Sequence, residues 1–86
     1  MIAKISNDFI INTDEIRFIL SYKSNSAKEI ISNAKKNNNL INATKGKGTR
    51  SVIVLKNNEV IASDYNPDTL YNKCSLAVNA IEVNEK

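Results

Sequence analysis

The stretch Leu40–Ser63 reads LINATKGKGTRSVIVLKNNEVIAS and holds both glycines of the chain and its densest apolar run. Within it, Val52–Leu55 are four consecutive apolar residues, three of them β-branched. This composition predicts a strand buried on both faces, and the run is too short to be a helix by itself. The polar residues Lys56–Glu59 predict a turn and Val60–Ser63 a return strand, so the two runs form a β-hairpin. A further short strand is expected at Leu40–Ala43.

The loop before the buried strand carries the tightest basic cluster of the chain. It places three cations around two glycines: Lys45, Lys47 and Arg50 around Gly46 and Gly48. On an extended backbone these cations would project to one side about 6–7 Å apart, close to the spacing of phosphates along one nucleic-acid strand. Thr44 and Thr49 could add hydroxyl contacts to phosphate. A hairpin loop with solvated lysines explains the same residues, and taken alone they favour this second interpretation.

Two shorter apolar runs precede this stretch, besides a weaker strand candidate at 2–5. Phe9–Ile11 predicts a strand, and Ile16–Tyr22 alternates with period two, which is typical of a strand with one buried face. The turn-prone residues 12–15 between the runs predict a hairpin. The competing interpretation makes Thr13 the N-cap of a helix that ends near Leu20. We favour the hairpin, because isoleucine and phenylalanine suit a strand better than a helix. Both phenylalanines, Phe9 and Phe18, are expected to face the core.

Two helices are expected. Ser26–Glu29 fits a capping box, a hydroxyl residue followed three positions later by glutamate. An apolar stripe at helical spacing follows it, formed by Ala27, Ile30, Ile31 and Ala34. The asparagines 37–39 predict its end. Asn66–Asp68 predicts the start of a second helix, with asparagine as N-cap and proline at the first helical position.

These elements predict an α+β fold, a small and mainly antiparallel sheet with two helices. We expect residues 1–75 to form a single domain and residues 76–86 a C-terminal tail of uncertain structure. With 86 residues the domain is marginal as a monomer, and oligomerisation would be a natural remedy. The net charge of +3 is compatible with an anionic partner and proves none.

The composition also argues against several functions. The chain has no histidine and a single cysteine, Cys74, so no zinc set can be drawn and the commonest general base is missing. Gly46 and Lys47 do not belong to a nucleotide-binding P-loop, because position 41 is isoleucine where that motif needs glycine. We therefore predict no enzyme, no metal or other cofactor and no small-molecule substrate. A lone cysteine, no long apolar span and no secretory signal predict a cytoplasmic protein without a membrane partner.

The segment Leu40–Leu55 resembles the core signature of the small bacterial extracellular-matrix regulators RemA and RemB. In RemA-like proteins the signature reads roughly Leu-Ile-Asp-Ala-Thr-Tyr-Gly-Arg-Arg-Thr-Arg-Ala-Val-Val. Asn7–Ile16 is similar to the start of RemB-like proteins, and Asn66–Leu70 resembles the start of the family's last helix. Together the resemblance covers about residues 1 to 75 without a large gap.

The resemblance implies a transcriptional regulator of matrix and biofilm genes that binds double-stranded DNA as a ring-shaped homo-oligomer. It also implies a subunit similar to the LytTR type of DNA-binding domain. By position, the family's adjacent arginines fall on Lys47 and Gly48, and its Thr-Arg pair falls on Thr49 and Arg50. Another family arginine falls on Glu15, with Arg17 two positions further on. The expected DNA-binding residues are Lys45, Lys47, Thr49, Arg50 and Arg17.

The departures from the family pattern leave a second function open. One arginine has become lysine, one glycine and one glutamate, and lysine lacks the arginine fork. The chain could therefore be an oligomeric structural or protein-interaction module of the same fold with little DNA affinity. In that case the apolar tail Leu76–Val83 would pack on a neighbour or a partner.

Overall fold

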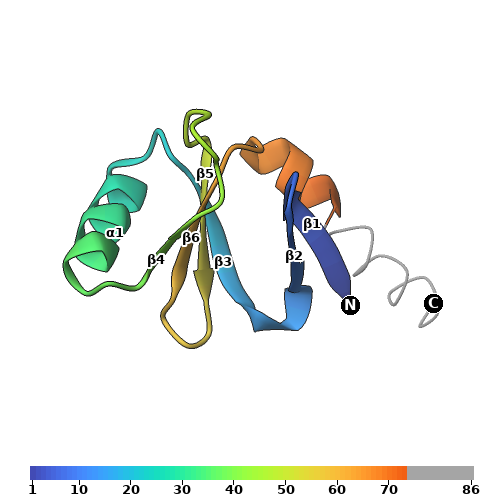
Figure 1. The fold of residues 1–86 in the computed structure, drawn as a ribbon, viewed down its shortest axis with the longest axis horizontal. Helices are drawn as coiled ribbons and strands as arrows, with labels where there is room; N and C mark the ends of the chain where they lie inside the picture. The colour runs from blue at the N-terminus through green and yellow to red at the C-terminus, as the bar shows by residue number, and fades with distance from the viewer. Residues whose placement is uncertain (74–86) are drawn as a thin grey trace.

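The computed structural model describes residues 1–73, which are arranged in three layers (Figure 1). A four-stranded sheet lies in the middle, the long helix covers one face, and a two-stranded hairpin with a second helix covers the other. The elements are β1 (Ile2–Ser6), β2 (Phe9–Asn12), the 3-10 turn η1 (Thr13–Glu15), β3 (Ile16–Ser21), α1 (Asn25–Lys36), β4 (Leu40–Asn42), β5 (Ser51–Leu55), β6 (Val60–Ser63) and a helix over 67–73. The predicted α+β class is confirmed.

The central sheet has the strand order β3-β5-β6-β4. β5 is antiparallel to both of its neighbours, β3 and β6, whereas β4 runs parallel to β6. β3 and β4 therefore run in the same direction, which requires a crossover connection, and α1 supplies it. The predicted hairpin is confirmed, with Val52 opposite Ala62 and Val54 opposite Val60.

β5 is buried on both faces and separates two hydrophobic cores, as its composition predicts. Its even-numbered side chains, Val52 and Val54, face α1, and Ile53 faces the β1–β2 hairpin. The first core, between the sheet and α1, consists of Ala27, Ile31, Ala34, Val52, Val54, Val60 and Ala62. The second, between the sheet and the hairpin, consists of Ile5, Ala43, Ile53, Ile61 and Leu70.

The predicted hairpin between Phe9–Ile11 and Ile16–Tyr22 is wrong. β2 pairs with β1, and β3 pairs with β5 in the other sheet. The competing long helix does not form either, because η1 is only three residues long. The Asn12 side chain accepts a hydrogen bond from the backbone N–H of Asp14 at 3.0 Å, which tightens this turn. The turn carries the chain from the outer hairpin into the central sheet, so the two strands do not meet.

Phe18 does not face the core as expected, since 40% of it is exposed. A register shift between Ile16 and Phe18 leaves one extra residue, Arg17, in β3. Because of this bulge, Ile16 and Ile19 both pack on the second core although they are three residues apart. Phe18 therefore lies on the same face of the sheet as α1. That helix packs over β6 and β4, so it does not cover Phe18 on the edge strand β3. Phe9 does pack against the second core, as predicted.

The N-cap of helix α1 lies two residues before the expected one. Ser24, not Ser26, is the N-cap, and its Oγ accepts a hydrogen bond from the backbone N–H of Ala27 at 3.1 Å. The predicted end is confirmed, because Asn37 caps the helix and Asn38 adopts a left-handed conformation with φ of 58°.

Replacing Ser24 by alanine is expected to lower the free energy of unfolding by about 1 kcal/mol, because it removes the oxygen that caps α1. Ser26→Ala is the matched control and should change it by less than about 0.5 kcal/mol, since Ser26 is exposed. Urea titration followed by circular dichroism measures both. A larger loss for Ser26→Ala than for Ser24→Ala would contradict the assigned cap.

The second helix begins where the sequence predicts. The Asn66 side chain accepts a hydrogen bond from the backbone N–H of Thr69 at 3.0 Å. Leu70 is fully buried and fixes the helix on the second core. Cys74 and the expected tail, 76–86, lie outside the described residues. Within residues 1–73, neither helix has the length and apolar character needed to cross a membrane.

Candidate nucleic-acid interface

The loop that joins β4 to β5 is a tight turn followed by an extended segment. The Asn42 side chain accepts hydrogen bonds from the Thr44 backbone N–H at 2.9 Å and from its hydroxyl at 2.6 Å. The Lys47 N–H then donates to the Thr44 carbonyl at 3.1 Å. Lys45 and Gly46 both have positive φ, 53° and 88°, which suits glycine and is uncommon for lysine. The expected extended backbone through this part of the loop is therefore wrong.

Both loop lysines contact acids from other parts of the fold. Lys45 forms an ion pair with Asp8, which lies in the turn between β1 and β2. The Lys47 Nζ lies 3.9 Å from a carboxylate oxygen of Asp64, which follows β6. The Asp64 side chain is only 9% exposed, and its other oxygen lies 2.8 Å from the Ser6 hydroxyl. These two lysines are thus fixed to the hairpin and to the end of β6.

Arg50 is positioned differently from the loop lysines. Its backbone is held on both sides, because its N–H donates to the Ser63 carbonyl at 2.9 Å and its carbonyl accepts from the Tyr22 N–H at 3.0 Å. Its side chain is exposed, and within residues 1–73 it forms no ion pair. A fixed backbone with a free guanidinium presents five N–H donors to solvent at a defined place.

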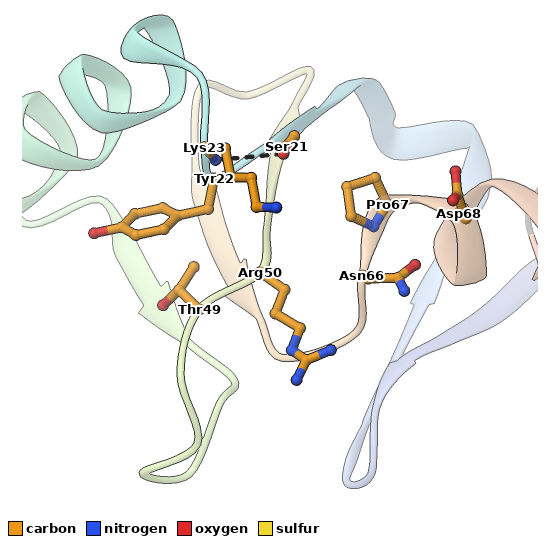
Figure 2. Close-up of a pocket in the computed structure, with 8 residues that line it drawn as sticks. All are labelled: Ser21, Tyr22, Lys23, Thr49, Arg50, Asn66, Pro67 and Asp68. Atoms are coloured by element: carbon orange, nitrogen blue, oxygen red, sulfur yellow. Dashed lines mark hydrogen bonds between the residues drawn. The ribbon is translucent and has the colours of Figure 1, made fainter.

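The Arg50 side chain points into an open cleft of about 590 Å³ (Figure 2). The cleft is lined by Ser21, Tyr22, Lys23, Thr49, Arg50, Asn66, Pro67 and Asp68. Lys23 also points into it, and Asn66 and Pro67 form the opposite wall. One wall forms because β3 is antiparallel to β5, so the end of β3 meets the start of β5. The opposite wall follows β6, whose end lies beside the start of β5.

Four of the five expected DNA-binding residues lie at this end of the molecule, and Arg17 does not. Arg17 sits at the start of β3, five residues from Tyr22, which is about 16 Å along a strand. Its guanidinium lies over the Phe18 ring, 6.0 Å from the centroid. Arg17 and Arg50 therefore cannot contact the same phosphate from one subunit.

Lys23 is the cleft residue that the sequence did not indicate. Locally it is one lysine in a loop between a strand and a helix, which is common on any surface. Only the pairing of Ser21 with Ser51 brings it beside Arg50. A correct prediction of the β3–β5 pairing would have indicated that Lys23 lies beside Arg50.

The site offers charge and hydrogen-bond donors. Within residues 1–73 no three histidine, cysteine or acidic side chains lie close enough to hold a metal ion. In the same part of the chain every buried side-chain nitrogen and oxygen has a hydrogen-bond partner. The cleft is lined by two cations, Lys23 and Arg50, and one carboxylate, Asp68, together with the Thr49 hydroxyl and the Asn66 amide. The excess of cations and donors is suited to contact with an anion.

Comparison with known proteins identifies the family. A family model described as RemA-like, extracellular matrix regulatory protein A-like, matches residues 2–74. The chain belongs to the RemA-like family. The resemblance inferred from Leu40–Leu55 is thereby confirmed.

The chain is also similar to individual bacterial proteins of the same kind. One from Finegoldia magna is 41% identical over 61 residues, which cover 71% of this chain and 74% of that protein. One from Carboxydothermus hydrogenoformans is 36% identical over 73 residues, covering 85% and 84%. One from Leptospira biflexa is 34% identical over 77 residues, covering 90% and 82%. All three are named as candidate regulatory proteins, so the family assignment and the relatives agree on a regulatory role rather than an enzymatic one.

Proposed function

We propose that this RemA-like protein is a DNA-binding transcriptional regulator of extracellular-matrix and biofilm genes, and that it acts as a ring-shaped homo-oligomer. The observation that carries the proposal is Arg50, whose backbone is hydrogen-bonded on both sides while its guanidinium is free in the cleft. Thr49 and Lys23 line the same cleft and supply a hydroxyl and a second cation. DNA binding also places the protein in the bacterial cytoplasm.

Phosphate is the anion that fits this site best. A guanidinium can donate two parallel hydrogen bonds to one phosphate group, which a lysine ammonium cannot do. Such contacts fix the position of a protein on DNA without reading its sequence. One subunit offers few of them, so its own affinity would be low. Repetition of the cleft around an oligomer would turn weak contacts into strong binding.

Several surfaces of the described residues support association of subunits. Ile2 and Ile10 lie on the outer face of the β1–β2 hairpin and are 72% and 65% exposed. β3 is an edge strand of the central sheet, and its residue Phe18 is exposed. Exposed apolar side chains and a free strand edge are features that a neighbouring subunit can cover.

Binding to duplex DNA is expected to weaken steeply as salt rises, because phosphate contacts release bound counterions. The logarithm of the association constant should fall linearly with the logarithm of salt concentration, by roughly 0.9 for each phosphate contacted. Fluorescence anisotropy with a labelled duplex, between about 50 and 200 mM salt, measures this slope. Light scattering on the same sample gives the mass and hence the oligomer. Absence of binding at the lowest salt would contradict the proposal.

A structural or protein-interaction module is the second candidate function. The observation that favours it is the pairing of Lys45 and Lys47 with acids, which removes two of the expected cations from the contact surface. This alternative predicts an oligomer of the same mass with no measurable affinity for duplex DNA. The anisotropy and light-scattering measurements therefore separate the two functions.

A further inference from the structure

The carboxylates of Asp8 and Asp64 lie beside the cations of the candidate site, and neither acid has a role in the proposed contact with DNA. Asp8 lies in the turn between β1 and β2, more than 30 residues from Lys45 in sequence, and the two side chains are 56% and 60% exposed. Asp64 is held more firmly, with 9% of its side chain exposed and the Ser6 hydroxyl 2.8 Å away. Two carboxylates at these positions lower the attraction of the surface for phosphate.

We propose that Asp8 and Asp64 limit the affinity of this surface for polyanions by pairing with Lys45 and Lys47, so that these lysines add little to sequence-independent phosphate contact. The inference rests on the proposed DNA-binding function and adds to it which residues limit that binding. Arg50 then sets the affinity, and the acids keep binding to arbitrary polyanions low.

The physical basis is that an exposed cation attracts every polyanion, whatever its sequence. A free lysine contacts any phosphate, so it raises binding to every DNA sequence alike. A carboxylate next to that lysine lowers this general affinity in two ways, by competing for the ammonium group and by repelling phosphate. Asp64 is nearly buried and hydrogen-bonded to Ser6, so its carboxylate stays in place beside Lys47, whose ammonium lies 3.9 Å away. The Asp8–Lys45 pair is exposed and is therefore the one that a single substitution can release.

Asp8→Asn is the test. It removes the charge and retains a residue that suits a turn. We expect its affinity for a duplex of arbitrary sequence to rise by up to about fivefold for each contacting subunit. The salt slope should become steeper by about 0.9 for each contacting subunit, because Lys45 becomes a phosphate contact. Asp14→Asn is the matched control, since it changes the net charge equally and lies in η1, after the other end of the hairpin. It should leave affinity and slope unchanged.

Two further variants show whether the gain acts through Lys45. Lys45→Gln alone should bind DNA more weakly than the wild type, because it leaves the Asp8 carboxylate without its partner. Lys45→Gln in the Asp8→Asn background should abolish the gain. Glutamine is chosen because it removes the charge and keeps a flexible polar side chain only one atom shorter, at a position with positive φ where the strain is already present. Asp8→Glu should bind DNA with the affinity of the wild type, since it keeps a carboxylate at this position.

Elution from a heparin column with a salt gradient gives a second readout that does not require DNA binding. Asp8→Asn should elute at higher salt than the wild type and than Asp14→Asn. Equal shifts for both variants would show a simple effect of net charge and overturn the inference. An unchanged Asp8→Asn on DNA and on heparin would also overturn it, while wild-type binding to DNA would leave the proposed function standing. A heparin shift without any DNA binding would support the inference and contradict the proposed function.

Discussion

Replacing Ile53 by alanine is expected to lower the free energy of unfolding by about 3–4 kcal/mol. Ile53 is fully buried in β5, where it faces Ile61 across the strand pair and contributes to the core under the β1–β2 hairpin. The substitution removes apolar surface from this core and leaves a cavity that the neighbouring strands cannot close. A domain of this size has roughly 4–13 kcal/mol of stability in total, so the variant should lose between about a quarter and nearly all of it.

The same substitution at Ile10 is the matched control. Ile10 lies in β2 on the outer face of the hairpin and is 65% exposed, so Ile10→Ala should cost less than about 1 kcal/mol. Chemical denaturation of the three proteins at one concentration measures the difference. Similar stabilities for the two variants would mean that β5 is not the buried centre of the fold.

The parts of the fold that were predicted correctly depend on neighbours in sequence. Four consecutive apolar residues followed by a polar turn predict the β5–β6 hairpin, because both strands and their connection lie within Ser51–Ser63. The stripe of α1 and the Asn66 cap are local in the same sense. In each case the residues that determine the structure lie within the element that they form.

The errors share the opposite cause. Phe9–Ile11 and Ile16–Tyr22 have the pattern of hairpin strands, but β3 pairs with β5, which lies about 35 residues further along the chain. The bulge at Arg17 shifts the inward face of β3 by one residue, and period-two counting cannot detect it. At the start of α1, Ser24 and Ser26 are both suitable caps, and the backbone conformation selects the earlier one.

The candidate site divides in the same way. Arg50 and Thr49 follow from the basic loop itself, and the cleft places them together. Lys23 reaches the cleft only through the β3–β5 pairing. Asp8 approaches the loop because the hairpin packs on the sheet, and Asp64 approaches it because β6 pairs with β4. A sequence pattern can therefore indicate the charges of a surface, whereas the acids that neutralise them come from distant segments.

Replacing Arg50 by alanine is expected to reduce affinity for duplex DNA by at least about tenfold. Of the three expected cations at this end of the molecule, Lys45, Lys47 and Arg50, only Arg50 has no acid partner within residues 1–73. Its guanidinium can form two charged hydrogen bonds with one phosphate. Because an oligomer repeats the loss in every subunit, the effect should exceed that of one contact. Arg50→Lys should recover only part of the affinity, since lysine keeps the charge and lacks the fork.

Lys56→Ala provides the control for this substitution. Lys56 is exposed in the turn between β5 and β6, at the opposite end of β5 from Arg50 (Figure 1). Lys56→Ala removes the same charge from the molecule as Arg50→Ala does. A general effect of net charge on DNA affinity would therefore appear equally in both variants. Thermal unfolding and light scattering of each variant confirm that fold and oligomer are unchanged.

The most direct measurement is the affinity of the wild type, Arg50→Ala and Lys56→Ala for one labelled duplex at about 50 mM salt, where phosphate contacts are weakly screened. We predict that the wild type and Lys56→Ala bind alike and that Arg50→Ala binds at least about tenfold more weakly. Equal affinities for all three proteins, or a loss confined to Lys56→Ala, would contradict a DNA-binding site at the Arg50 cleft.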